Sequence, residues 1–403
     1  MTPKTSTRTV SRVAVATLVV SLAAAAGCST DAPKGSTSSA MGARNASNAG
    51  GLQDSVNAIL KAGSVGVVAQ STDPRGSRYA TAGKADRQTG DAVRRDDRFR
   101  MGSTTKPFVA TVVLQLVREG QLSLDDTVEH WLPGVVSGNG NDGGKITVRQ
   151  LLQHTSGLFD YLNDFPEIAS VEGYQADRYV VRTPEELVAI AMRHKPGFRS
   201  GTKWGYSNTN YVLAGMIIEK ATGKSWEEEV TQRIIRPLHL RDTSAPTTET
   251  HISGHHMRGY SSFGGPGKAI DVTEYSPTAA DAAGSMIGTA ADVNTFFSAL
   301  MDGELLRPTQ LNEMEKTVRA PLLDALEPGA GYGLGLAKVP LTCGGVYYSH
   351  GGDLPGYTTR NGVSADGRHA VAVQATGEGS ANPAIEKALA TLIDREFCAS
   401  GRR

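Results

Sequence analysis

Residues 99–118 read FRMGSTTKPFVATVVLQLVR and join a strand pattern directly to a helix pattern. The first residues of this stretch are strand-like, whereas apolar residues recur on one side of the segment 108–119 and Gly120 then supplies a stop signal. Ser103 and Lys106 lie at the start of the predicted helix. Because residues three apart share one face of a helix, the two side chains are predicted to lie next to each other.

The position of this pair suits nucleophilic catalysis. The positive end of the helix dipole favours a developing alkoxide on Ser103 and opposes a second positive charge. Burial lowers the pKa of a lysine as well, and a neutral Lys106 can accept the serine proton. The pattern alone is weak evidence, because Ser103 could simply cap the helix. A second S-x-x-K occurs at Ser200–Lys203, in a glycine-rich loop where the spacing fixes no shared face.

Strand patterns lie at both ends of the chain. Apolar runs at 65–69 and 77–82 flank the turn sequence Asp73–Gly76 and predict a hairpin. The late strand-like segments cover residues 346–349, 357–363 and 369–375. The last predicted helix covers residues 382–397. We therefore expect an α+β fold in which an antiparallel sheet from both termini is flanked by helices, with a helical subdomain inserted at about 120–285.

Helices are predicted between these strands and just before the first of them. Capping boxes begin helices at Thr147, Thr183 and Ser225. The other predicted helices cover residues 52–62, 210–221 and 289–301. The folded domain is therefore expected over 52–400.

The N-terminus has the pattern of an export signal. A basic segment precedes the apolar run 13–26, which is too short to span a bilayer. The sequence AAGC at residues 25–28 resembles a bacterial lipobox, in which Cys28 carries lipid; cleavage within 23–26 is the alternative. We expect a signal peptide at 1–27 and a flexible linker at 28–51. The protein is then exported, either as a lipoprotein on the outer face of the cytoplasmic membrane or in secreted form.

Cysteine usage favours lipidation. The chain has three cysteines, Cys28, Cys343 and Cys398. If Cys28 carries lipid, the other two remain as a pair, and an oxidising compartment permits a disulfide between them. On the chain-entropy model, such a bond is worth roughly 4 kcal/mol.

Two further motifs carry chemistry. Tyr206-Ser207-Asn208 precedes an apolar helix; a phenol can relay a proton if a neighbouring cation lowers its pKa, and an asparagine can hold an amide. His350-Gly351-Gly352 ends a strand, and its glycines let a substrate approach the backbone. Each motif alone is weak. Similar spacings occur at 161–163 (YLN), 61–63 (KAG) and 203–205 (KWG).

Taken in this order, the three motifs resemble those of the serine penicillin-recognising superfamily. The resemblance is to Streptomyces-type secreted D-alanyl-D-alanine carboxypeptidases and class C β-lactamases, and it extends over residues 52–398. The segments that carry it are FRMGSTTK (99–106), QLLQHTSGL (150–158), YSNTNY (206–211) and YGLGL (332–336).

The resemblance implies a serine hydrolase that forms an acyl-enzyme on D-alanyl-D-alanine peptides of peptidoglycan or on β-lactams, without metal or organic cofactor. Ser103 would attack the carbonyl and Lys106 would activate it. Tyr206 would pass the proton to the leaving group, while Asn208 would hold the substrate amide. His350 would replace the third-motif lysine of the family and supply polarity near Tyr206.

The same resemblance places the substrate along the third motif. Gly351, Gly352 and Asp353 would line the site, with the backbone N–H groups of Ser103 and Asp353 forming the oxyanion hole. The family's groups for a terminal carboxylate are missing, because Gly351, Asp353 and Ala337 stand at those positions. A carboxypeptidase would then depend on the neighbouring Lys338 for a positive charge.

Other function classes fit less well. The chain has no G-x-S-x-G of an α/β-hydrolase and no H-E-x-x-H, and His251, His255 and His256 read as solvated loop residues rather than metal ligands. Net charge is zero, which argues against nucleic-acid binding. Two alternatives stay open: a β-lactamase, esterase or amidase of the same superfamily, and a slow-turnover sensor lipoprotein that binds penicillin. Very slow release of a bound acyl group would favour the sensor.

Overall fold

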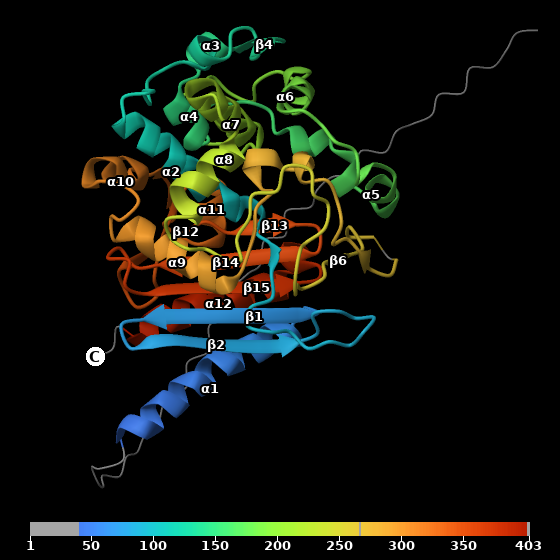
Figure 1. Ribbon diagram of the computed structural model, residues 1–403, viewed down its shortest axis with the longest axis vertical. Coiled ribbons are helices and arrows are strands. Elements are labelled where there is room, and N and C mark those ends of the chain that lie inside the picture. The colour runs from blue at the N-terminus through green and yellow to red at the C-terminus, as the bar shows by residue number, and fades with distance from the viewer. Residues whose placement is uncertain (1–39, 266, 401–403) are drawn as a thin grey trace, which may run out of the picture. The chain divides into compact units, whose positions relative to one another are not determined.

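The computed structural model describes residues 40–265 and 267–400, and its main sheet joins strands from both ends of the chain (Figure 1). Over these residues the strand order is β2-β1-β15-β14-β12-β11-β10-β9, with β13 paired to β14. Strand β1 (Gly66–Asp73) pairs antiparallel with β15 (Ala370–Thr376), and β2 (Gly76–Gly83) completes the predicted hairpin. The remaining strands of this sheet are β9 (Val318–Arg319), β10 (Gly331–Tyr332), β11 (Ala337–Pro340), β12 (Val346–Ser349), β13 (Gly352–Leu354) and β14 (Tyr357–Val363). The predicted fold class is confirmed.

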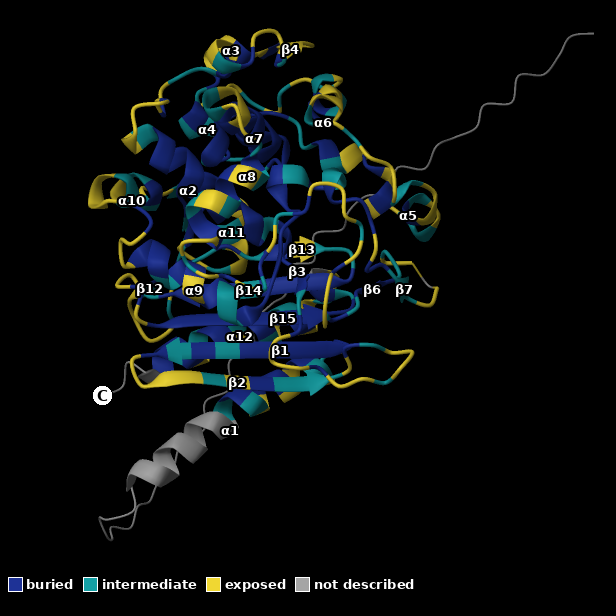
Figure 2. Ribbon diagram, in the orientation of Figure 1, coloured by how far each residue is buried: buried dark blue, intermediate teal, exposed yellow. Residues whose placement is uncertain are grey.

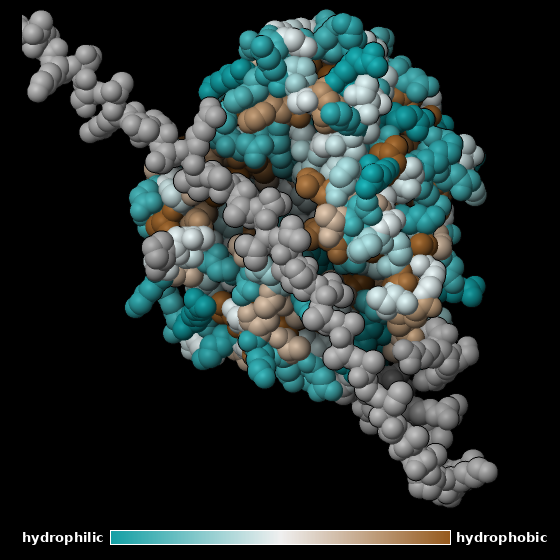
Figure 3. Space-filling view, turned by 180° about the vertical axis from the view of Figure 1, so that it is seen from behind, coloured by the Kyte–Doolittle hydropathy of each residue, from teal (hydrophilic) through white to brown (hydrophobic). Residues whose placement is uncertain are grey.

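The sheet is covered by helices on both faces. In β15, Ala370 and Ala372 pack into the hydrophobic cluster of α2 (Thr105–Arg118), α7 (Thr209–Thr222) and α9 (Ala290–Met301). Val371, Val373 and Ala375 pack into the cluster of α1 (Ala40–Lys61) and α12 (Pro383–Ser400). This alternation is the period of two of a strand, with both faces buried. Figure 2 shows β1 and β15 almost entirely in the buried class. On the face in Figure 3, the periphery is mainly hydrophilic and hydrophobic side chains gather toward the middle.

The helical elements begin where the capping pattern predicts. Thr147, Thr183 and Ser225 each form a capping box with the residue three positions later. The helices are α1 (Ala40–Lys61), α2 (Thr105–Arg118), α3 (Val128–Trp131), α4 (Val148–Leu152), α5 (Val171–Asp177), α6 (Pro184–Met192), α7 (Thr209–Thr222), α8 (Trp226–Val230), α9 (Ala290–Met301), α10 (Pro308–Glu315), α11 (Pro321–Leu326) and α12 (Pro383–Ser400). Over the described range, no helix is both long and apolar enough to cross a membrane.

Two sequence predictions need correction here. The first helix begins at Ala40 rather than Leu52, so residues 40–51 of the predicted linker are helical. Residues 1–39, with the predicted signal peptide and Cys28, lie outside the described residues.

The α-helices of the predicted insert 120–285, α3 to α8, lie only in its first part. After residue 240 it forms loops and short pairings, because glycines such as Gly254, Gly259 and Gly264 interrupt any helix. The short strand pairs are β3 (Phe99–Arg100) with β8 (Ile287–Gly288), β4 (Ser137–Gly138) with β5 (Asn141–Asp142), and β6 (Tyr260–Ser261) with β7 (Ile270–Asp271).

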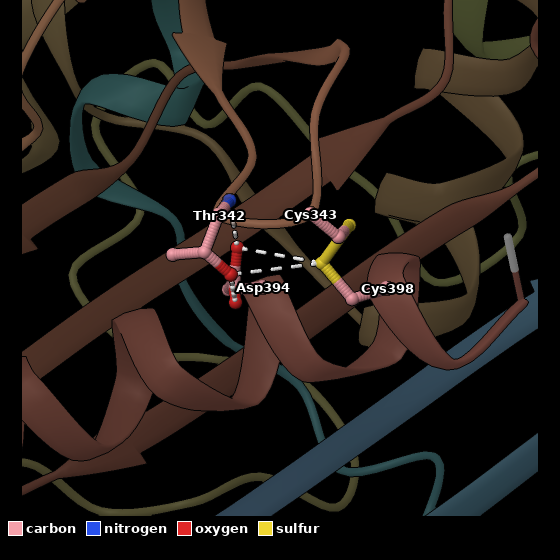
Figure 4. The surroundings of a disulfide bond; sticks show 4 residues. All are labelled: Thr342, Cys343, Asp394 and Cys398. Atoms are coloured by element: carbon pink, nitrogen blue, oxygen red, sulfur yellow. Dashed lines mark hydrogen bonds between the residues drawn. A yellow bond between two sulfur atoms is a disulfide. The ribbon is translucent and has the colours of Figure 1, made fainter. Parts of the chain in front are cut away.

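The structure joins Cys343 and Cys398 in a disulfide (Figure 4). The bond ties the turn between β11 and β12 to the end of α12. Next to it, the Thr342 backbone N–H and hydroxyl both donate to the Asp394 carboxylate. The cross-link therefore holds the last helix against the strands that lead to His350.

Removing this disulfide is expected to lower the stability of the fold. A variant with Cys343→Ser and Cys398→Ser should lose up to about 4 kcal/mol of unfolding free energy, because its unfolded chain is no longer cross-linked over 55 positions. Urea unfolding of the wild type with and without reductant, beside the double variant, measures the effect. The unfolding midpoint of the double variant should not change when reductant is added. A wild-type midpoint that also stays unchanged in reductant would contradict the prediction.

Candidate active site

Ser103 lies in a 3-10 turn, η1 (Gly102–Thr104), between β3 and α2. Gly102 has a φ of 56°, and a Cβ there would lie 2.8 Å from the Asp353 nitrogen. A side chain at this position would therefore be strained and would collide with β13. The glycine lets the nucleophile turn pack directly on the strand of the third motif.

Lys106 is fully buried, and its Nζ lies 2.9 Å from Ser103 Oγ. The Nζ also donates to Asn208 Oδ1 and to the Ala283 carbonyl, each at 2.7 Å. Neither of these oxygens can donate a hydrogen. A neutral amine has two N–H groups and one lone pair, so the two acceptors take both hydrogens and leave the lone pair facing the Ser103 hydroxyl.

Electrostatics support the same state of the lysine. Burial lowers the pKa of Lys106 to about 7, although the nearby Asp160 acts in the opposite direction. Near neutral pH a large fraction of the molecules therefore holds Lys106 as a free base. This is the behaviour expected from the position of the S-x-x-K motif.

The Tyr206 hydroxyl lies 2.8 Å from Ser103 Oγ and donates to it. The condition stated for a proton relay, a phenol whose pKa is lowered by a neighbouring cation, is not met, because burial raises the pKa of Tyr206 well above 10, against the opposing effect of the hydrogen bond to Ser103. Lys106 lies 4.9 Å from the ring centroid, but it is itself buried and close to neutral. Tyr206 thus donates to Ser103 as a neutral phenol, and the geometry leaves Lys106 able to accept the serine proton.

Asn208 lies between Lys106 and a carboxylate that the motifs did not indicate. Its Nδ2 donates to Asp160 Oδ2 at 2.9 Å, while its Oδ1 accepts from Lys106. Burial raises the pKa of Asp160, and Lys106 and Asn208 partly offset this. The amide predicted to hold substrate lines the cavity, and its Oδ1 and Nδ2 contact Lys106 and Asp160.

His350 is buried, and both nitrogens of its ring have partners. Nδ1 lies 2.7 Å from the Gly351 carbonyl, which can only accept, so Nδ1 carries the hydrogen. Nε2 then accepts from the Tyr332 hydroxyl at 2.8 Å. Burial, with a smaller effect of Lys106, lowers the pKa of His350 to about 3. His350 is therefore neutral and contacts Tyr332, so it does not replace the positive charge of a third-motif lysine.

The glycines of the third motif bring β13 onto the nucleophile turn. A Cβ at Gly352 would lie 1.9 Å from the Met101 carbonyl and 2.8 Å from the Ser103 nitrogen. Asp353 pairs with Thr358 across the hairpin, one position from the closing pair of a two-residue turn. In the alternation of antiparallel pairs, its N–H points away from β14, toward η1. The predicted oxyanion donors, the N–H groups of Ser103 and Asp353, thus lie on neighbouring backbone segments.

The Asp353 carboxylate is paired with Arg360 of β14, each contact being 3.1 Å long. Arg360 also forms a salt bridge with Glu386 of α12. Lys338 does not supply the missing cation, because it alternates with the cavity-lining Ala337 along β11 and its Nζ lies over the Tyr348 ring. Arg360 was not predicted as a site residue, because it belongs to none of the motifs. It contacts Asp353 only because β13 pairs with β14.

These groups surround a cavity of about 400 Å³. The residues of the three motifs and their neighbours that line it are Ser103, Tyr206, Asn208, Ala283, Gly284, His350, Gly351 and Asp353, and its other lining residues include Leu323, Leu326, Glu327, Arg360 and Glu386. The second S-x-x-K takes no part, because the Ser200 hydroxyl donates to Gln150. Among the described residues no three His, Cys, Asp or Glu side chains form a metal-binding group, and His255 contacts Arg94.

Comparison with known proteins agrees with this geometry. The model of the family described as Beta-lactamase matches residues 48–394. A D-stereospecific amidohydrolase from Streptomyces sp. is 43% identical, with a TM-score of 0.78 over 87% of this chain and 98% of that one. A D-amino acid amidase from Ochrobactrum anthropi SV3, complexed with L-phenylalanine amide, is 30% identical, with a TM-score of 0.76 over 88% and 98% of the two chains.

A third relative, penicillin-binding protein 4 from Amycolatopsis lactamdurans, is 30% identical over 221 residues, which is 55% of this chain and 55% of that protein. The match thus spans about half the length of this relative. The family model, in contrast, extends from α1 to α12 and includes all three motifs. The chain belongs to the Beta-lactamase family of serine hydrolases, together with the penicillin-binding proteins.

Proposed function

We propose that this hydrolase cleaves the amide bond of D-aminoacyl amides and peptides whose α-amino group is free. The likeness to the Streptomyces D-stereospecific amidohydrolase supports the reaction class, because it extends over 98% of that chain. The charges of the cavity support the preference for a free amine. This second observation comes from the present structure and carries the proposal.

Charged side chains in the cavity favour an ammonium group over a carboxylate. Glu327, Asp353 and Glu386 line it, against the single described guanidinium of Arg360. Arg360 is already shared by Asp353 and Glu386. Burial raises the pKa of Glu327, so this residue adds less negative charge than the other two. A terminal carboxylate therefore meets no unpaired cation among the described lining residues, whereas an ammonium group meets excess negative charge.

The arrangement supports acyl transfer in two steps. Ser103 Oγ bonds to the substrate carbonyl carbon while its proton passes to Lys106 Nζ, and the carbonyl oxygen takes up negative charge near the N–H groups of Ser103 and Asp353. The carbon–nitrogen bond then breaks, and the leaving nitrogen takes the proton held by Lys106. Water next attacks the ester, gives a proton to Lys106 and releases Ser103, which regains its proton.

A D-alanyl-D-alanine carboxypeptidase is the second candidate. The similarity to a penicillin-binding protein and the three motifs favour it. Such an enzyme must accept a free carboxylate next to the scissile bond, where the paired state of Arg360 is unfavourable. A peptidoglycan stem peptide is then the substrate, and β-lactams are the expected inhibitors. We also propose that the enzyme works outside the cytoplasm, as the disulfide suggests, which fractionation of cells tests.

The two candidates are separated by a substrate panel. We expect D-alanine amide to be hydrolysed with a kcat/KM at least about tenfold above that of its N-acetyl derivative, because a favourable charge contact is worth about 1.4 kcal/mol or more. L-Alanine amide and diacetyl-L-lysyl-D-alanyl-D-alanine are measured in parallel. Preference for the diacetyl peptide over D-alanine amide would favour the carboxypeptidase, and equal rates on the D- and L-amides would contradict D-selectivity.

A further inference from the structure

A second cavity of about 410 Å³ adjoins the catalytic one, and we call it the distal groove. Leu162, Ala280, Asp353 and Leu354 line both cavities. From Asp353 the groove continues along the tip of the β13–β14 hairpin. Its other walls include Phe165, Ile168, Tyr174, Arg178, Phe263, Tyr275, Pro355 and Ala381. A substrate bound at Ser103 can therefore extend past these shared residues into the distal groove.

The walls of the distal groove are mostly apolar and aromatic. Tyr174 and Tyr275 are buried, and Phe263 and Leu354 pack against their cluster. Phe263 has a φ of 53°, which is unfavourable for a bulky residue, and its ring centroid lies 5.7 Å from that of Tyr174. The loop between β6 and β7 thus holds a strained aromatic residue at this wall, as ligand-binding sites often do.

Arg178 is the described charged residue of the groove that lacks an opposite charge. Glu167 pairs with Arg182, and the Glu378 carboxylate is bound by the Ser262 backbone and the Ser261 hydroxyl. No salt bridge involves Arg178 in the described part of the chain, and its Nε is buried without a hydrogen-bond partner. The guanidinium lies against the rings of Tyr174 and Tyr179, at 5.3 and 4.6 Å.

We propose that the distal groove binds the leaving group of a short peptide, with apolar residues along its walls and the terminal carboxylate at Arg178. This inference rests on the proposed function, which places the free ammonium of the substrate in the acidic catalytic cavity. The two cavities then match the two charged ends of a zwitterionic peptide. Because Arg178 lines the groove and not the catalytic cavity, it is reached only by a leaving group that fills the groove.

The test uses three substrates that share one acyl group: D-alanine amide, D-alanyl-L-leucyl-L-leucine, and the same tripeptide with a C-terminal amide. The wild-type kcat/KM for the free acid should exceed that for the amidated tripeptide by about tenfold or more. The reason is that a hydrogen bond between Arg178 and a charged carboxylate is stronger than one to a neutral amide. Arg178→Gln should bring this ratio close to one, whereas Arg178→Lys should keep part of it. Arg236→Gln, an exposed arginine outside the groove, is the matched control and should keep the wild-type ratio.

A second variant tests the groove by its shape. Ala381 is exposed at the rim of the groove, so Ala381→Trp should lower the ratio of tripeptide to D-alanine amide hydrolysis. Ala384→Trp, at an exposed position just inside α12, should leave that ratio unchanged. Because each readout is a ratio within one enzyme, a loss of folded protein does not mimic the effect.

The outcomes separate the two proposals. If D-alanine amide is not hydrolysed, the proposed function fails. If it is hydrolysed but the wild type does not distinguish the free acid from the amidated tripeptide, or Arg178→Gln keeps the distinction, the groove inference is overturned and the proposed function stands.

Discussion

Replacing Ser103 with alanine is expected to lower kcat on D-alanine amide by about 10⁴-fold or more, because no acyl-enzyme can then form. The Ser103 hydroxyl lies next to two groups that can exchange a proton with it. Its Oγ lies within 2.9 Å of both Lys106 Nζ and Tyr206 Oη, the two groups that move or share its proton. A residual rate above that in water is expected from the oxyanion donors and substrate binding alone. Steady-state hydrolysis of D-alanine amide measures the loss of kcat. Intact mass after incubation with benzylpenicillin measures the loss of the acyl-enzyme.

The chain supplies its own control for this experiment. Ser200 belongs to the other S-x-x-K, donates to Gln150 and does not line the cavity. Ser200→Ala should therefore retain the activity and any penicillin adduct of the wild type. Wild-type activity in Ser103→Ala would exclude the assigned nucleophile and with it the proposed mechanism.

The second large effect is expected at Lys106. Lys106→Met keeps much of the buried volume but removes the base, so kcat should fall by about 10²- to 10⁴-fold, the usual range for general-base catalysis. It also leaves Asn208 Oδ1 and the Ala283 carbonyl without their donor. Lys338→Met is the matched control, because Lys338 faces away from the cavity, and its activity should remain that of the wild type.

The pH profile distinguishes loss of the base from loss of packing. The lysine acts when it is neutral, and its pKa in the folded protein is lowered to about 7. Wild-type kcat should therefore rise as pH increases through about 7 and level off above it, whereas kcat/KM on D-alanine amide should fall again above about pH 8, where the substrate loses its ammonium proton. In Lys106→Met this rise should disappear. A rise at the same pH in the variant would assign it to another group and contradict the role of Lys106.

The catalytic pair could be predicted because its geometry is local. Ser103 and Lys106 are three positions apart at a helix start, and helix geometry alone brings them together. A sheet built from both ends of the chain was also predictable, because strand patterns at the two ends each need a partner. The disulfide followed from the cysteine count once Cys28 was set aside.

The groups that tune the site were not predictable in the same way. Asp160 meets Asn208 across 48 positions, and the Ala283 carbonyl meets Lys106 across 177 positions. A carbonyl has no sequence signature at all, and an isolated aspartate or arginine such as Arg360 resembles any surface charge. The direction of the Tyr206 pKa shift could not be predicted either, because the sequence shows the neighbouring lysine but not that both residues are buried.

The connectivity of the main sheet has a consequence for how the protein is made. The Gly66 N–H donates to Thr376 Oγ1, 310 positions further along the chain. At usual rates of translation, the ribosome needs roughly 15 to 60 s to reach β15 after it has made β1. During that time the β1–β2 hairpin has an open edge of unpaired N–H and C=O groups, which invites aggregation. The newly made chain should therefore depend on chaperones until β15 pairs with β1.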